Sequence, residues 1–389
     1  MSISAITGKP WLSAYPDILI SVEHNSEEVE HLSNDYEAIT RFVQEQIIDV
    51  ELPLNTLEIT KPAVTSILRG FGSLGWKPLF DVSSTQKSPR YVIHSPNQQE
   101  VLQMVGGKVF RHPKRTETIC TRKHLTKRML ELGQLPVAIG GDFLPEEKEI
   151  AVAYFEMMTK PAVVKPADSG GSAGVTVGVV DNLEFEKAWD NALAGGRKNS
   201  RVLIEKFVRG IELRAYVIGN QVVSIIARVQ PFVVGTGSAT VAQLIRDDNI
   251  ARKINYRAHK LPVVVDWDFV KKWGHGENTV PRAGEILFLN RLSIPQVGAL
   301  IVDVTASVSP SIKEIAVRAK SMIPDLEIAG IDILVNDLAD SGSAYILEIN
   351  TSAALDLHRY PTHGLAREVD KDIVDYFHQW YTGSSGFRV

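Results

Sequence analysis

Residues 328–350 read Ile-Ala-Gly-Ile-Asp-Ile-Leu-Val-Asn-Asp-Leu-Ala-Asp-Ser-Gly-Ser-Ala-Tyr-Ile-Leu-Glu-Ile-Asn. Two apolar runs flank a polar turn, and this pattern predicts a β-hairpin. Because side chains alternate along a strand, Glu348 and Asn350 share a face, and Asp332 is available from the partner strand. These oxygen ligands suit Mg²⁺, which takes one or two carboxylates plus substrate phosphates. The alternative is that these three side chains belong to the solvent-exposed outer face of an ordinary hairpin.

The composition is that of an ordinary globular chain. Its 389 residues are 44% hydrophobic and 23% charged, which is enough for two or three domains. The net charge of −4 gives no overall basic field for nucleic acid or an anionic membrane. No apolar run reaches the roughly 18 residues of a membrane span. The N-terminus lacks a signal-peptide pattern, so we expect a cytoplasmic protein.

The chain divides into regions with different patterns. Residues 1–118 alternate strand and helix signals and predict a small α/β domain that helps to form a substrate cleft. Residues 119–208 mix helices and strands, 209–381 are rich in strands, and 382–389 form a Gly/Ser-rich tail. We expect helices at 26–49, 63–70, 121–133, 146–158, 183–193, 240–248 (capped by Thr240), 311–322 and 368–380. We expect strands at 17–22, 90–94, from 134, 161–165, 175–179, 201–208, 212–218, 222–229, 262–266 and 285–290.

A Gly/Ser-rich loop follows an apolar strand that ends at Lys165. It contains Ser169, Gly170, Gly171 and Ser172. Backbone N–H groups in such loops approach phosphate oxygens closely, and an adjacent lysine adds a point charge. The pattern is not a Walker A loop, and a hairpin turn beside an ordinary lysine is the alternative. Its polar residues favour a mobile flap over a nucleotide.

The segment Glu205-Lys206-Phe207-Val208 ends another apolar strand. It can offer backbone N–H and C=O groups to a purine. Glu212 follows seven residues after Glu205 and could accept hydrogen bonds from ribose hydroxyls. On spacing alone, a surface position for Glu212 at the start of a strand is favoured.

Several basic residues are further candidates for the site. Arg214, Arg228 and Arg291 lie in or at the end of strand-like runs, and arginine binds carboxylate or phosphate with a bidentate fork. Each alone fits a structural ion pair, whereas three near a magnesium–phosphate centre favour a catalytic role. His358 and His363 flank a segment shortly after Asn350 and are candidates for the cleft, solvated loop histidines being the alternative.

In this order, the motifs resemble those of the ATP-grasp superfamily. The first lysine segment of D-alanine–D-alanine ligases is similar to Lys123-His-Leu-Thr-Lys-Arg-Met-Leu followed by Leu135-Pro-Val. Their second lysine and flap are similar to Val163-Val-Lys-Pro and the Gly/Ser loop after it. Glu205 to Val208 with Glu212 resembles the adenine hinge and ribose carboxylate. Asp332, Glu348 and Asn350 resemble the magnesium set.

The resemblance is closer to the ATP-grasp part of cyanophycin synthetase and of bifunctional glutathione synthetase. It covers residues 121–381 and rests on Gly210-Ile-Glu-Leu-Arg-Ala-Tyr-Val-Ile-Gly, Ala227-Arg-Val-Gln-Pro-Phe-Val-Val-Gly-Thr-Gly-Ser-Ala-Thr, Ile301-Val-Asp-Val-Thr and the segment 350–367. Two departures occur. Gly235-Thr236-Gly237 stands where those families have Gly-Asp-Gly, and Thr351-Ser-Ala-Ala-Leu-Asp replaces a Pro-Gly-like turn near the amino-acid site, which leaves the substrate open.

The resemblance implies an α/β (α+β) ATP-grasp fold. A pre-ATP-grasp domain (1–118) would precede a lid (119–208) and a C-terminal catalytic subdomain (209–381). Lys123 and Lys165 would hold the phosphates of ATP, with Mg²⁺ or alternatively Mn²⁺, and His358, Arg359 and Arg367 would contact substrate.

The implied function is an ADP-forming carboxylate–amine ligase acting through an acyl phosphate on amino acids or peptides. It would have no nucleic-acid or membrane partner, and related enzymes suggest a homodimer. Two alternatives stay open: an ATP-grasp enzyme with a thiol acceptor or a phosphorylated product, and a non-catalytic ATP-binding module.

Overall fold

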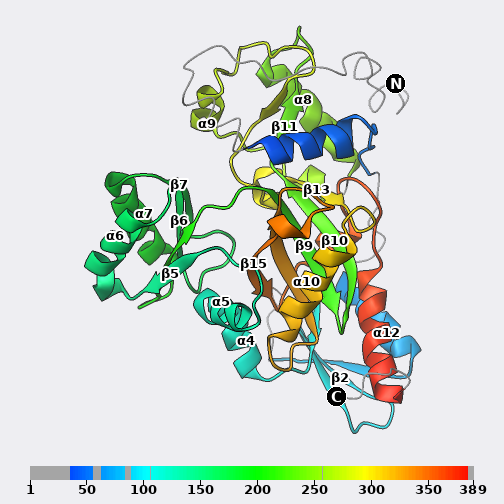
Figure 1. Ribbon diagram of the computed structural model, residues 1–389. Coiled ribbons are helices and arrows are strands. Elements are labelled where there is room, and N and C mark those ends of the chain that lie inside the picture. The colour runs from blue at the N-terminus through cyan, green and yellow to red at the C-terminus, as the bar shows by residue number, and fades with distance from the viewer. Residues whose placement is uncertain (1–35, 56–62, 84–88, 106, 256, 384–389) are drawn as a thin grey trace.

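The structure is a computed structural model that describes residues 36–55, 63–83, 89–105, 107–255 and 257–383. The strand predicted at 17–22 and the first part of the helix predicted at 26–49 lie outside these residues. Three antiparallel sheets of four or five strands and a two-stranded ribbon organise the chain (Figure 1). Across the described ranges, no helix is long and apolar enough to cross a membrane.

The central sheet has five strands in the order β13-β10-β9-β14-β15. They are β9 (Ile211–Ile218), β10 (Gln221–Val229), β13 (Leu300–Asp303), β14 (Ile328–Val335) and β15 (Tyr345–Asn350). The predicted hairpin is confirmed, since β14 pairs with β15 and Asp332 lies directly opposite Glu348. This sheet therefore places the predicted magnesium ligands on neighbouring strands.

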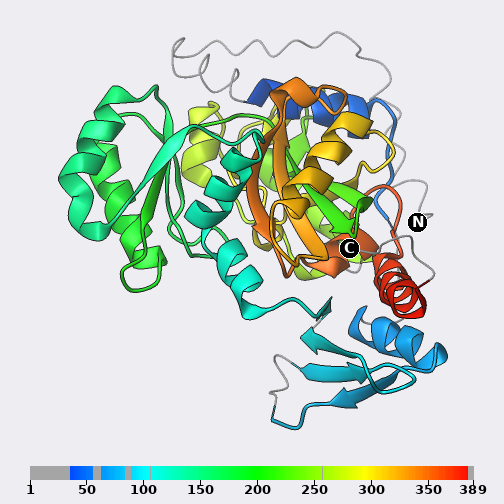
Figure 2. The same cartoon turned by 60° about the horizontal axis from the view of Figure 1, so that its bottom comes forward.

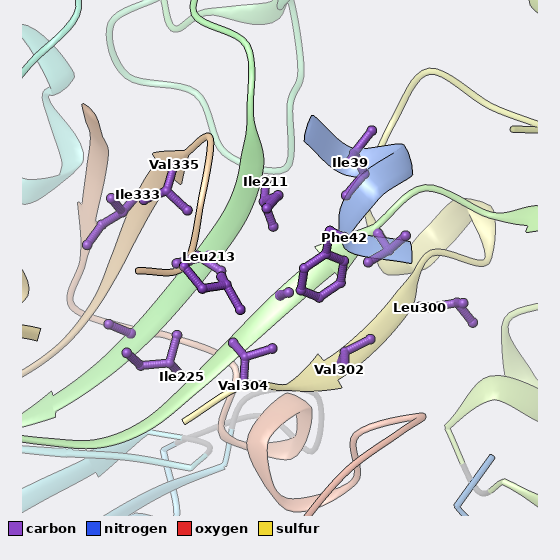
Figure 3. Packing of buried hydrophobic residues seen from close by; sticks show 14 of the residues in the cluster. Ile39, Phe42, Ile211, Leu213, Ile225, Leu300, Val302, Val304, Ile333 and Val335 are labelled. Carbon is purple, nitrogen blue, oxygen red and sulfur yellow. The ribbon is translucent and has the colours of Figure 1, made fainter. Parts of the chain in front are cut away.

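One face of the central sheet forms the largest hydrophobic core. Leu213 and Ile331 on this face pack with α10 (Pro310–Ser321) and with a helix at residues 36–43 that continues as a π-helical turn, Gln44–Ile48. Figure 3 shows Ile39 and Phe42 of that helix among side chains of β9, β10 and β13. Each such buried side chain contributes about 1.5–3 kcal/mol. The opposite face carries polar side chains beside a smaller apolar cluster of Ile226, Ile301 and Leu357.

A second, four-stranded sheet stands beside the central sheet, within the segment 119–208 that was predicted as the lid (Figure 1). We use the name lid for this sheet and the two helices that pack on it. Its order is β5-β8-β6-β7, with β5 (Gly140–Phe143), β6 (Ala162–Pro166), β7 (Thr176–Val179) and β8 (Val202–Lys206). α6 (Lys148–Met157) and α7 (Asn182–Gly195) bury Phe155, Phe185 and Trp189 against it. α4 (Lys114–Thr121) and α5 (Lys123–Leu132) lie between the lid and the central sheet in both views (Figure 2).

The N-terminal region contains a third sheet. β1 (Lys77–Phe80), β2 (Arg90–His94), β3 (Val101–Val105) and β4 (Lys108–Phe110) follow one another as an antiparallel meander. α3 (Ala63–Ser73) and α12 (Val369–Thr382) pack with it in one cluster. The helix predicted at 63–70 and the strand predicted at 90–94 are confirmed as α3 and β2, whereas the short strands β1, β3 and β4 were not predicted.

The segment between β10 and β13 forms a further lobe. It holds β11 (Phe232–Val234), α8 (Val241–Ala251), α9 (Trp267–Lys272) and β12 (Ile286–Phe288). Thr240 caps α8 as predicted, with Gln243 completing a capping box. α11 (Leu355–Arg359) follows the central sheet.

Two predicted strands differ from the structure. Residues 262–266 form no strand because the Val263 and Val264 amides donate to the Asn249 side chain and the Val297 carbonyl, not to a ladder. The strand predicted to open at residue 134 begins later than expected, since Val137 forms a single bridge to Ile346 and the strand proper is β5 at Gly140–Phe143.

Candidate active site

A row of side chains crosses the face of the central sheet that lies opposite the largest hydrophobic core. Glu348, Asp332, Arg214, Ile226 and Asp303 are directly opposite one another on successive strands. Directly paired residues point to the same face. The sheet register therefore brings acidic and basic groups from four strands into one line, with Ile226 of β10 between Arg214 and Asp303.

Asp332 is the centre of a buried charge network. It is 2% exposed, and Arg214 donates to its two oxygens at 2.6 Å each, through Nε and Nη2. Arg228 Nη2 donates to Asp332 at 2.8 Å and also to Glu212. Burial alone would raise the pKa of Asp332, but Arg214 and Arg228 hold it well below its usual range. Asp332 is thus ionised and fixed between two guanidinium groups.

Glu212 has partners on both carboxylate oxygens. Arg228 binds Oε1, and the hydroxyl of Ser293 donates to Oε2. Burial raises the pKa of Glu212, with Arg228 opposing the effect. Ser293 lies in the loop after β12, so the lobe between β10 and β13 contributes directly to this network.

The group Asp332, Glu348 and Asn350 has the chemistry of a divalent-cation site. Asn350 Nδ2 donates to Glu348 Oε1 at 2.8 Å, and the Glu348 side chain is within hydrogen-bonding reach of Asp332. Two carboxylates and an amide oxygen match the hard ligands of Mg²⁺. Lys123 Nζ lies 3.4 Å from Glu348 Oε2 and Arg214 lies 3.9 Å from Oε1, so cations already gather at this corner. The residues present fit the metal.

Three lysines approach from the lid side. Lys123 Nζ donates to the carbonyl of Ser169 at 2.6 Å. Lys165 Nζ lies 2.6 Å from Glu205 Oε2, and Lys127 Nζ lies 2.9 Å from Glu205 Oε1. Burial would raise the pKa of Glu205, but Lys165 and Lys127 keep it below its ordinary value. A pocket at this junction is lined by Lys123, Lys127, Leu130, Val137, Lys165, Leu203, Glu205, Ile346 and Leu347.

The Gly/Ser loop lies beside Lys123, to which the Ser169 carbonyl connects it. Gly171 and Ser172 adopt positive φ, and a Cβ added to Gly170 or Gly171 would meet open space. Consecutive backbone N–H groups in such conformations form anion-binding concavities.

The segment after β8 is partly engaged within the lid. The amides of Lys206 and Phe207 donate to the carbonyls of Ile139 and Pro161. Val208 lies between this anchored pair and the positive-φ Gly210 that opens β9.

Other candidate residues lie apart from this cluster. Arg291 pairs with Asp266 at 2.8 Å and its side chain is 45% exposed. Arg367 binds Asp303 at 2.7 Å, at the far end of the row, and Arg359 binds Asp370 at 3.3 Å.

His358 and His363, expected in the cleft, are both buried. The Nδ1 atom of His358 shares a hydrogen bond of 2.7 Å with the hydroxyl of Ser224, and the ring packs edge-on against Tyr216. His363 contacts the hydroxyl of Thr362 at 3.0 Å. The sheet face around them is covered by α11, which explains why neither ring lies in open solvent.

Two residues of the network were missed by sequence reasoning. Lys127 follows Lys123 by four positions on α5, and this spacing places both on one helix face, so it was a usable signal. Ser293 reaches Glu212 from a loop 81 positions away in sequence, and nothing in the local pattern indicates that contact.

The mixed helix and antiparallel-sheet architecture agrees with the fold class predicted from the sequence. The structure resembles that of a bifunctional glutathione synthetase from Pasteurella multocida, with a TM-score of 0.57, 19% identity, and coverage of 82% of this chain and 43% of the other. Residues 134–236 match the family model described as D-ala D-ala ligase C-terminus.

Two relatives illustrate the sequence similarity. Cyanophycin synthetase from Geminocystis herdmanii is 28% identical over 273 residues, which is 67% of this chain and 30% of that protein. The glutathione biosynthesis bifunctional protein GshAB from Clostridium perfringens is 27% identical over 272 residues, which is 67% of this chain and 34% of that protein. The chain spans about a third of the length of these relatives. The resemblance inferred from the motifs is confirmed.

Proposed function

We propose that this protein is an ATP-dependent carboxylate–amine ligase that releases ADP and phosphate. The observation that carries the proposal is the convergence of Lys123 and Lys165 from the lid side with Asp332 and Glu348 of the central sheet. Opposed cationic and anionic walls suit a nucleotide triphosphate with its metal ion. The family and fold matches support the same activity.

Each part of the site has a role in this proposal. Asp332, Glu348 and Asn350 would hold Mg²⁺, which neutralises phosphate charge when bound. Lys123, Lys165 and the loop 169–172 would bind the phosphates. The segment 205–208 would meet the adenine edge, and Glu212 would accept from the ribose hydroxyls.

The chemistry is proposed to follow from positioning and charge. The substrate carboxylate attacks the γ-phosphorus, and ADP leaves with the electron pair of the broken P–O bond. Arg214 and Arg228 lie beside the carboxylates and would stabilise the charge that develops. An amine then attacks the acyl phosphate, loses a proton and expels phosphate, which leaves an amide. The substrates would be amino acids or peptides in the cytoplasm, and the protein would act as a homodimer.

The test is ADP release with Mg-ATP and amino acids, offered singly and in pairs, with product masses recorded. We expect ADP only with a particular pair, and a product lighter than their sum by one water. A thioester or a phosphorylated product would replace the amide proposal, and ATP binding without turnover across the panel would favour a non-catalytic module.

Two variants test the metal assignment. Asn350→Ala and Glu348→Ala remove proposed ligands from partly exposed positions of β15 and are expected to abolish turnover while the fold is retained, as judged by circular dichroism. Normal turnover in both variants would contradict the metal site.

A further inference from the structure

A buried ion triad joins the lid to α5. The carboxylate of Glu205 lies between two ammonium groups, at 2.9 Å from Lys127 and 2.6 Å from Lys165. The three side chains are 9–13% exposed. Interactions between charges at such short distances are screened little by solvent when the groups are buried.

The three lysines of the pocket are held differently. Lys127 donates to the carbonyl of Ala138 at 2.5 Å as well as to Glu205, so protein acceptors fix its ammonium group on two sides. Lys123, one turn earlier on α5, points instead to Ser169 and Glu348. Among the described residues, Lys165 has Glu205 as its ion-pair partner.

The charge balance of the triad depends on Lys127. With two ammonium groups and one carboxylate, the triad has an excess of one positive charge. Without Lys127, Lys165 would be the only lysine left to compensate Glu205, because a buried carboxylate is very costly when unpaired. The positive charge of Lys165 would then be consumed within the protein.

We infer that Lys127 is a positioning residue that neutralises Glu205 and thereby keeps Lys165 available for the phosphates of a nucleotide. This inference rests on the proposed nucleotide site. It assigns Lys127 an effect that acts through Glu205 and not through direct contact with substrate. The lowered pKa of Glu205 supports it, since the carboxyl group is ionised at neutral pH.

The experiment measures Mg-ATP binding to the full chain by calorimetry, without other substrates. Lys127→Met is expected to raise the Kd at least about tenfold, which corresponds to about 1.4 kcal/mol. The double variant Lys127→Met/Glu205→Gln removes the carboxylate as well and is expected to lower the Kd to within about threefold of that of Glu205→Gln alone, which is the reference because Glu205 belongs to the proposed adenine segment. Arg128→Met, on the next position of α5 with a side chain that is 60% exposed, is the matched control and should bind as the wild type does.

The rescue separates positioning from a purely structural role. If Lys127 only stabilised the fold, the second substitution would add to the damage and would not restore binding. An unchanged Kd in Lys127→Met, or no rescue in a double variant that is folded by circular dichroism, overturns the inference while the proposed function stands. Absence of Mg-ATP binding by the wild-type chain overturns both.

Discussion

At the scale of single residues, the site depends on charges held away from water. Asp332 is bound by Arg214 and Arg228, and Arg228 continues the network to Glu212. Removing one member of such a buried network leaves the others uncompensated, which costs about 3–5 kcal/mol. These side chains therefore contribute to the stability of the central sheet as well as to its proposed chemistry.

Buried histidines predict a pH-dependent stability. Burial lowers the pKa of His358 to about 3 and that of His363 to about 4. In the unfolded chain both titrate near pH 6.5, so below this pH the unfolded state binds more protons. The contribution to stability is complete above pH 6.5 and falls as the pH drops toward the folded pKa, by about 1.4 kcal/mol per pH unit for each histidine.

Substitution of one ring tests this dependence. We expect His358→Phe to remove the share of one buried histidine from the loss of unfolding free energy between pH 6.5 and 5, as measured by urea denaturation. A slope in His358→Phe equal to that of the wild type would show that another group titrates.

At the scale of elements, Gly330 sets the position of the segment that follows β15. Gly330 lies opposite Asn350 in the β14–β15 ladder, and a Cβ added there would be 2.4 Å from Cβ of Ala353. The segment 351–354 therefore folds back over the sheet directly above a residue without a side chain. This is the same segment in which the sequence departs from its relatives.

Gly330→Ala is expected to displace this segment. Overpacking of this kind costs about 1–3 kcal/mol, and we expect a comparable loss of unfolding free energy together with weakened turnover. Gly72→Ala in α3, where an added Cβ meets open space, should instead be neutral or stabilise by up to about 1 kcal/mol. Equal stability and turnover in Gly330→Ala and the wild type would contradict the close packing.

The sequence predicted those elements whose signals are local. The hairpin at 328–350 combines alternation with a polar turn, and Thr240 with Gln243 forms a capping box, so both follow from neighbouring residues. The apolar run at 262–266 misled because its backbone partners come from other segments.

In the candidate site too, the sequence predicted only those contacts that follow from neighbouring residues. Asp332, Glu348 and Asn350 come together as the hairpin register requires. The pairing of Lys127 with Glu205 spans 78 positions, and the burial of His358 depends on α11 packing over the sheet. Such long-range contacts have no local signature.

At the scale of the whole molecule, the proposed nucleotide site joins the lid, α5 and the central sheet. A ligand that binds only this assembled arrangement stabilises the fold by mass action, by about 2.7 kcal/mol at one hundred times its Kd. We expect Mg-ATP to raise the Tm by a few degrees, since 1 kcal/mol corresponds to about 2–4 °C for 150–250 residues and to less for a longer chain.

Metal removal separates the contribution of the metal ion to the Tm increase from that of ATP alone. Excess EDTA should reduce the Tm increase given by ATP, because the charge of the phosphates then faces Asp332 and Glu348 directly. Glu348→Ala should show a smaller EDTA effect than the wild type. An identical Tm increase with and without EDTA would contradict metal-assisted binding.

The helix at 36–48 has a consequence for how the chain is made. Its apolar side chains, among them Ile39 and Phe42, are buried against β9, β10 and β13, and Val302 belongs to the same cluster (Figure 3). During synthesis these side chains emerge early, whereas their partners near residue 302 emerge more than two hundred residues later. The helix therefore waits for these partners while more than two hundred further residues are translated, and its apolar face is open to non-native contacts during that time.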